Sequence, residues 1–304
     1  MKTCIYIHVV LFYGIIHLNT YSQDVFPYSS CDVDNILMVQ NNIRKQKLRS
    51  RITWLQDNIG GNHFQTGKKI KQENYNRDGS LAEIIYFNQN EKTDSITIIA
   101  NNASGLPYKT ETFDPLGNLL STVRFTYSQA NLILDVRYYR KSKMPYSVIK
   151  TGYKDDTIRI WELDHGTKII SKTIIVYNSN NSCNNIFYTT KTYNEKDSLV
   201  FNSSISIINN KKITNVYLPV KHQIIQTNNS FSQPVEITKM DENNQVETSI
   251  VYNYSENGLI NGFVTYNGLM QSESGNENYD ILSNEKPEKK SGLMKIIKYS
   301  YLFY

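Results

Sequence analysis

The chain has 304 residues, with 33 basic and 28 acidic side chains and a formal net charge of +5 at pH 7. The excess of positive charge is small and the two signs are mixed, so the composition does not favour a nucleic-acid-binding protein. Tyrosine is abundant at 23 residues, whereas glycine and proline number 14 and 7. Asparagine gathers between segments rich in Tyr, Ile, Val and Thr, which is typical of an all-β chain with tight turns.

The first residues have the pattern of a secretory signal. An apolar run, Ile5–Leu18, follows Lys2, and small residues lie just beyond it. The run is short for a bilayer span, and the pattern predicts a cleavable signal peptide over residues 1–22 with Gln23 as the first mature residue. A membrane anchor is the alternative, which two histidines in the run disfavour. We therefore expect a secreted, periplasmic or cell-envelope protein with no transmembrane span in the mature chain.

A short helix is expected in the next segment, residues 23–47. Apolar residues recur three and four positions apart at Ile36, Val39 and Ile43, and Asp34 is available as an N-cap. From Leu48 the period changes to that of extended chain.

Short strands separated by turn signals follow along the rest of the chain. The expected strands begin with Leu48 in "LRSRITWLQ" and continue as Lys69–Asn76, Leu81–Phe87, Ser95–Ala100, Pro107–Phe113, Leu119–Tyr127, Leu132–Tyr139, Tyr146–Tyr153, Thr157–Leu163, Lys168–Tyr177, Ile186–Tyr193, Leu199–Ile208, Lys212–Leu218, His222–Thr227, Val235–Met240, Val246–Tyr254 and Ile260–Tyr266. No crossover helix separates them, so the pattern predicts an antiparallel meander of β-hairpins over residues 48–266.

The carboxy-terminal part is expected to form a polar loop, residues 267–292, and a last strand, residues 293–304. In the final segment the bulky residues Ile297, Tyr299, Tyr301 and Phe303 alternate with Lys298, Ser300 and Leu302, as in a strand. An aromatic carboxy-terminus is also typical of outer-membrane barrels, but the preceding strands are short and charged on both faces, which argues against a lipid-facing wall.

One spacing recurs in five segments of the hairpin region. A bulky residue is followed four positions later by a turn residue and two positions after that by an aliphatic one, in "YNRDGSL", "FDPLGNL", "YNEKDSL", "MDENNQV" and "YSENGLI". Another bulky residue follows six positions on, and an even spacing keeps both on one face of a strand. Tight hairpins need a positive φ in the turn, which we assign to Gly79, Gly117, Asp197, Asn244 and Gly258.

These segments resemble the YD repeat, Tyr-Asp-x-x-Gly-Arg-Leu, of RHS-type proteins. Phe113-Asp114 and Gly117–Leu119 match it best, and scattered copies extend over residues 69–266. The resemblance implies stacked β-hairpins in an extracytoplasmic bacterial protein, of the small secreted envelope type. Large relatives form a shell around a toxic domain, a role that this short chain without a recognisable toxin segment is not expected to share.

The residues that could carry chemistry are few. Cys31 and Cys183 could form a disulfide in an oxidising compartment, or remain two separate thiols. No metal or cofactor motif is present in the sequence. The best polar cluster is "WELDHG", where Trp161, Glu162, Asp164 and His165 could bind a ligand or perform acid–base chemistry, although a strand that ends in a polar turn explains the same residues.

These features predict a non-enzymatic secreted or periplasmic protein that serves as an envelope scaffold or binding module. The first alternative is a lipid or lipoprotein carrier in which a curved half-barrel sheet encloses an apolar cavity. The second is a glycan-active enzyme that uses Glu162 and Asp164. The partner, whether an envelope protein, a glycan or a lipid, is not identified by the sequence, and no nucleic acid is expected.

Overall fold

The computed structural model describes residues 27–56, 67–140, 143–177, 185–208, 210–229, 233–256, 258–267 and 293–304. The predicted signal peptide, Cys183 and residues 268–292 of the predicted loop lie outside these ranges. The described part contains one helix and eighteen strands: α2 (Ser30–Lys45), β1 (Leu48–Gln56), β2 (Lys68–Tyr75), β3 (Leu81–Phe87), β4 (Thr93–Asn101), β5 (Pro107–Phe113), β6 (Leu119–Tyr127), β7 (Ile133–Tyr139), β8 (Ser147–Lys154), β9 (Thr157–Asp164), β10 (Lys168–Tyr177), β11 (Asn185–Asn194), β12 (Leu199–Ile208), β13 (Lys211–Leu218), β14 (His222–Asn228), β15 (Pro234–Met240), β16 (Val246–Tyr254), β17 (Ile260–Asn267) and β18 (Leu293–Phe303).

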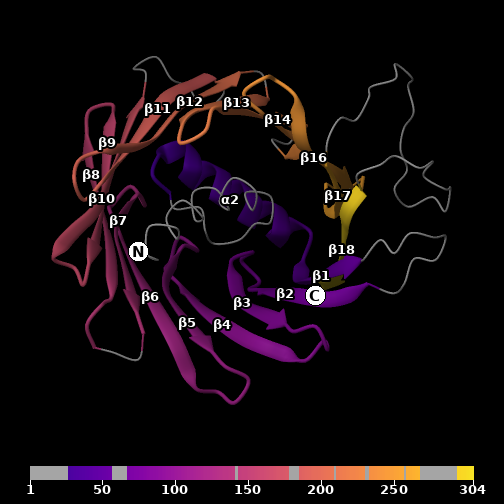
Figure 1. The fold of residues 1–304 in the computed structure, drawn as a ribbon. Helices are drawn as coiled ribbons and strands as arrows, with labels where there is room; N and C mark the ends of the chain where they lie inside the picture. Colours follow the sequence, from indigo (N-terminus) through magenta and orange to yellow (C-terminus); the bar gives the residue numbers. More distant parts are fainter. Residues whose placement is uncertain are drawn as a thin grey trace.

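The strands form a closed barrel. Each strand pairs antiparallel with the next along the chain, and β1 pairs with both β2 and β18, so that the first and last strands close the sheet (Figure 1). The predicted antiparallel meander of hairpins is confirmed. The half-barrel of the carrier alternative is wrong, because the β1–β18 pairing leaves no open edge at that seam.

The recurring spacing corresponds to one type of turn, which occurs at more places than predicted. The five expected turn residues all have positive φ, between 56° and 87°, and Glu91, Gly105 and Asn131 occupy the same place in three further turns. In each of these turns the residue after the strand accepts and donates backbone hydrogen bonds that close the loop, as in Asn76 N–H to Ser80 O at 2.8 Å and Gly79 N–H to Asn76 O at 3.0 Å. The extra residue per turn appears as a register shift beside each hairpin.

Tyrosines connect neighbouring turns at one end of the barrel. We call this end the capped rim; it carries the β2–β3, β4–β5, β6–β7, β8–β9, β14–β15 and β16–β17 turns. The hydroxyl of Tyr127 donates to Pro107 O at 2.7 Å, that of Tyr153 to Ile133 O at 2.8 Å and that of Tyr254 to Pro234 O at 2.6 Å. Each bond joins two turns that lie two strands apart. The abundant tyrosine therefore has a structural use at this rim.

Helix α2 begins earlier than expected. Ser29 is the N-cap and forms a capping box with Asp32: the Ser29 side chain accepts from Asp32 N–H at 3.2 Å, and the Asp32 carboxylate accepts from Ser29 N–H at 2.8 Å. The predicted N-cap, Asp34, is wrong because this reciprocal pair satisfies the first turn. In the described residues no helix is long and apolar enough to cross a membrane.

The two faces of the wall differ in polarity. Inward residues alternate with outward ones, and the inward set supplies most buried aliphatic side chains, such as Ile224, Ile237 and Ile250. Some outward positions near mid-strand carry charge, as in the Lys109–Glu111 ion pair on β5 at 2.8 Å and the Arg137–Asp135 pair on β7 at 2.8 Å. Others carry exposed apolar residues, such as Ile98 opposite Glu111. A lipid-facing barrel has a continuous apolar outer band. The outer wall of this barrel mixes charged and apolar side chains.

Candidate functional site

Helix α2 crosses the interior of the ring of strands (Figure 1) and contacts the turns of the capped rim. The side chain of Gln40 donates from Nε2 to Gly105 O at 2.9 Å. At the β2–β3 turn the helix backbone comes so close that a Cβ on Gly79 would lie 2.0 Å from Gln40 O. Glycine is needed at this position both for its positive φ and for this close approach.

The face of α2 that carries Val39 and Ile43 packs on the barrel wall below the capped rim. Ile43 is buried with Leu48, Tyr75, Leu81, Ile84 and Ile99, and Val39 packs against the same cluster. A cavity of about 20 Å³ remains between the helix and the wall, bordered by Ile43, Leu48, Arg51, Tyr75 and Tyr301 among others. This volume suits about one water molecule. The helix therefore closes this side of the lumen closely.

A buried ion pair lies next to this cavity. Arg51 on β1 and Glu73 on β2 are direct neighbours in register, and the Arg51 guanidinium contacts Glu73 Oε2 at 2.6 Å. Lys71 approaches Glu73 Oε1 at 3.1 Å, and the side chains of Arg51 and Glu73 are 3% and 0% exposed. Burial would raise the pKa of Glu73, but Arg51 and Lys71 more than offset it, so this pKa lies below its usual value.

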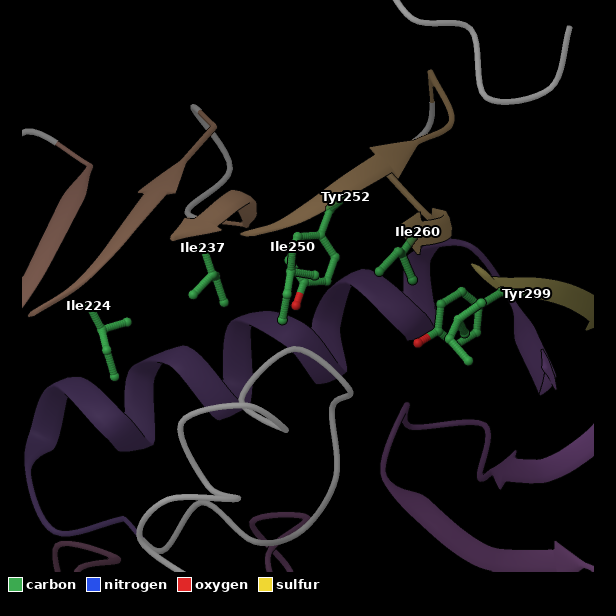
Figure 2. Close-up of a cluster of buried hydrophobic side chains, with 7 residues drawn as sticks. Ile224, Ile237, Ile250, Tyr252, Ile260 and Tyr299 are labelled. Carbon is green, nitrogen blue, oxygen red and sulfur yellow. The ribbon is translucent and has the colours of Figure 1, made fainter. Parts of the chain in front are cut away.

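An aliphatic surface lines the lumen beneath β14 to β18. Ile224, Ile237 and Ile250 form a row on consecutive strands, and Figure 2 shows these side chains on the side of the wall that faces α2. Tyr252 and Tyr299 extend the same cluster toward the β1–β18 seam. A barrel of 16 to 18 strands is too wide for wall side chains to fill, in contrast to one of about 8 strands. The side chains of this cluster are at most 9% exposed, so the aliphatic surface is already covered within the folded chain.

Buried hydroxyl groups lie beside this aliphatic surface. Thr53 and Tyr299 are opposite each other across β1 and β18, and Thr53 Oγ1 and the Tyr299 hydroxyl have no hydrogen-bond partner among the described residues. Burial raises the pKa of Tyr299, which keeps its hydroxyl protonated. Buried inward threonines also occur on β8, β10, β11 and β13, and the hydroxyls of Thr173 and Thr192 are 2.9 Å apart. The lumen thus combines an aliphatic sector with a hydroxyl-bearing one.

The residues of the predicted polar cluster are not brought together. Trp161 is opposite Lys150 and Lys172 on the outer wall, where its indole lies over Gly152. Glu162 is on the inner face, within 3.5 Å of the Ser147 hydroxyl and 3.4 Å of the Ser171 hydroxyl. Asp164 and His165 lie at the exposed β9–β10 turn.

This separation leaves Glu162 without the second carboxylate that glycoside hydrolysis normally uses. Its pKa is raised, mainly because burial disfavours the charged form. Asp164 contacts His165 at 3.7 Å in a solvent-exposed pair. Among the described residues no group of three or more His, Cys, Asp or Glu side chains could hold a metal ion. The geometry gives the glycan-active enzyme alternative no support.

Sequence reasoning missed the residues at the seam, although a signal for them exists. Arg51 is in phase with inward Thr53 and Leu55, and Glu73 is in phase with inward Tyr75. A charged residue in the inward phase of a strand is unusual, because an unpaired charge is costly to bury. Two such residues of opposite sign on adjacent predicted strands could have indicated a buried pair.

Cys31, at the start of α2, is disulfide-bonded. Its predicted partner, Cys183, lies outside the described residues, so that pairing stays a prediction. A disulfide on this helix is typical of a protein that folds in an oxidising compartment.

Comparisons with known proteins add a likeness of low similarity. No family model and no curated protein matches the chain. A porin-like protein from Bacteroides uniformis is 8% identical with a TM-score of 0.38, and the match covers 83% of this chain and 97% of that one. A porin-like protein from Bacteroides vulgatus is 14% identical with a TM-score of 0.30, covering 83% and 98%. In a TcdB2–TccC3–Cdc42 structure, 12% of a chain matches 71% of this one at 13% identity and a TM-score of 0.24. At these TM-scores the likenesses carry no argument about function.

Proposed function

We propose that this protein is an exported, non-enzymatic binding protein of the cell envelope that holds an amphiphilic, lipid-like ligand in the lumen of its barrel. The observation that carries this proposal is the inward aliphatic surface of β14 to β18 in a wide closed barrel. An apolar chain bound there would be removed from water at a gain of roughly 25 cal/mol per Å² of apolar surface buried.

The polar part of such a ligand has candidate partners at the β1–β18 seam. Thr53 Oγ1 and the Tyr299 hydroxyl are buried without partners among the described residues, and both can donate a hydrogen bond. The guanidinium of Arg51 lies 5.3 Å from the centre of the Tyr299 ring, which adds positive charge nearby. A head group with oxygen acceptors matches these donors.

Export is supported by two independent features. The amino-terminal pattern predicts a signal peptide, and Cys31 is disulfide-bonded, as expected outside the cytoplasm. Helix α2 then acts as the cover of the lumen at the capped rim. The scaffold role remains compatible with the same barrel, but it does not explain the unpaired hydroxyls inside.

The proposal is tested with a fluorescent fatty acid, dansyl-undecanoic acid, and with native mass spectrometry of protein purified from its own host. We expect the dansyl emission to rise and shift to the blue on binding, and the native protein to carry a lipid-sized mass that organic solvent extracts. Ile237→Trp, which puts a larger side chain in the middle of the aliphatic surface, should remove most of the dansyl response.

Thr238→Trp is the matched control, because Thr238 is the next residue on β15 and is paired with outward Ser249. It should leave the dansyl response unchanged. If neither the fluorescence nor the mass spectrum reveals a ligand, or if both variants respond like the parent protein, the lumenal function is excluded.

A further inference from the structure

Both tryptophans of the chain occupy the same kind of place on the outer wall. Trp54 on β1 is directly opposite Lys298 on β18 and Lys69 on β2. Trp161 on β9 is directly opposite Lys150 on β8 and Lys172 on β10. Each indole is therefore flanked by a lysine on both neighbouring strands.

The correspondence extends to the next strand and its turn. The ammonium of Lys69 lies 4.1 Å from the centre of the Phe87 ring at the end of β3, and that of Lys172 lies 5.2 Å from the Tyr193 ring near the end of β11. An acidic residue with positive φ follows in each turn, Glu91 in one and Asp197 in the other.

Each acidic residue also contacts its lysine. Glu91 Oε1 accepts from Lys69 N–H at 2.7 Å, and Asp197 Oδ1 lies 3.2 Å from Lys172 Nζ. We call these two groups the wall sites; their members are Trp54, Lys69, Phe87, Glu91 and Lys298 in the first and Trp161, Lys150, Lys172, Tyr193 and Asp197 in the second. Both lie near the rim opposite the capped one.

The two wall sites lie on different sides of the molecule. Figure 1 places β1 to β3 and β8 to β10 on opposite sides of the barrel, so one short ligand could not occupy both. Their exposure differs from that of core residues: Lys150 is exposed, and the indoles of Trp54 and Trp161 are half-buried on the outer wall. Two separate surfaces thus present the same set of groups.

We propose that the wall sites bind acidic polysaccharides. The electron-rich face of an indole attracts the C–H groups of a sugar ring. Lysines on the neighbouring strands, about 4.8 Å to either side, would attract the carboxylates of the same or the adjoining sugars. The carboxylates of Glu91 and Asp197 can accept hydrogen bonds from sugar hydroxyls, whereas they would repel the closely spaced phosphates of a nucleic acid.

Cross-strand packing explains part of this arrangement, since lysine stems commonly cover aromatic rings on sheets. It does not require the second aromatic ring and the acidic residue to recur with each tryptophan. In both sites one lysine places its ammonium over the second ring instead of the indole. The recurrence of five groups at two places favours a shared ligand.

The test is isothermal titration calorimetry of the full mature chain with a short oligogalacturonate, too short to reach from one site to the other. We expect two equivalent sites, quenching of tryptophan emission and an affinity that falls with added salt. Trp54→Ala and Trp161→Ala should each reduce the stoichiometry to one site, and the double variant should abolish binding. Asp197→Asn keeps an acceptor but removes the negative charge, and should tighten binding at that site about threefold.

Controls separate binding from folding and from the lumen. Trp161→Phe keeps an aromatic ring and should retain weaker binding, while Tyr217→Ala removes an exposed aromatic whose hydroxyl pairs with Ser204, and should change nothing. Ile237→Trp should also leave oligogalacturonate binding intact, so failure of the lumenal function is distinguishable. Unchanged binding by the double tryptophan variant, no binding at all, equal binding of neutral dextran, or tighter binding of single-stranded DNA would each overturn the proposal.

Discussion

The pair of Arg51 and Glu73 shows how two residues can affect the stability of the closed barrel. They join the first two strands at the seam, with the guanidinium and the carboxylate 2.6 Å apart and both side chains almost fully buried. Attraction within such a pair is balanced against the cost of removing two charges from water, so the intact pair adds little net stability. Loss of one partner is different, because the other charge then stays buried without compensation.

We predict that Glu73→Gln lowers the free energy of unfolding by about 3 to 5 kcal/mol, because Arg51 keeps its charge in the interior. The double variant Arg51→Met, Glu73→Gln should recover most of this loss. Chemical denaturation at neutral pH measures both. Glu195→Gln, which breaks the exposed Lys168–Glu195 pair, serves as the control and should cause no measurable change.

The same residue sets a pH dependence. Because the pKa of Glu73 is lower in the folded protein than in the unfolded chain, its contribution to stability is complete above the unfolded pKa and is lost as the pH falls through the folded value. The free energy of unfolding of Glu73→Gln, obtained from denaturation curves at several pH values, should therefore fall less on acidification than that of the parent protein. An equal fall in both proteins would contradict the assignment of this pH dependence to Glu73.

At the scale of elements, the turns and the helix are fitted to each other at the capped rim. Gly79 and Gly117 occupy the same place in their turns, with φ of 87° and 82°. A Cβ on Gly79 would meet the helix backbone at Gln40, whereas one on Gly117 would have no atom within 4 Å. The two glycines thus share one conformational requirement, but Gly117 lies in the β5–β6 turn at the opposite rim, away from the helix.

We predict that Gly117→Ala costs about 1 to 2 kcal/mol of stability, the usual penalty for a side chain in the left-handed region. Gly79→Ala should cost about 1 to 3 kcal/mol more, because the helix must shift to admit the methyl group. Thermal or urea unfolding gives both values, and limited proteolysis within α2 reports its displacement. Equal losses in the two variants would show that the helix does not rest on this turn.

Most of these elements could be predicted from the residues. Alternation and the six-residue spacing from Tyr75 to Leu81 placed the hairpins, because their turns obey local backbone chemistry. The turn at Asn131 follows the same spacing, from Tyr127 to Ile133, although it was not among the five predicted turns. The turn at Glu91 departs from the spacing, because Glu replaces Gly, Asn or Asp and Thr93 replaces the aliphatic residue. The Asn, Asp or Ser that opens each turn, such as Asn88 and Ser128, is the signal that would have found them.

At the scale of the whole molecule, closure of the barrel and the position of α2 could not be predicted. Pairing of Thr53 with Tyr299 joins residues from opposite ends of the chain, and no local pattern encodes such a contact. The separation of Trp161 from Glu162 has a local cause, since successive residues of a strand point to opposite faces of the sheet. Alternation along the expected strand could therefore have shown that these two residues do not form one site.

Removal of residues 293–304 tests whether closure holds the molecule together. The truncated chain would lose β18, its Ile297 and Tyr299 contributions to the aliphatic surface, and the hydrogen-bonded partners of both β1 and β17. Two unpaired strand edges would then be exposed, and such edges pair with those of other molecules. We expect aggregation, or a monomer with an unfolding midpoint far below that of the parent, in light scattering and urea titration.

Removal of Tyr304 alone is the control. The Tyr304 hydroxyl bonds to Tyr75 O and its N–H bonds to Lys47 O, so this deletion should lower the midpoint modestly and leave the protein monomeric. A monomeric truncated chain with an unchanged midpoint would mean that the seam adds nothing to stability and that the barrel is held by its hairpins.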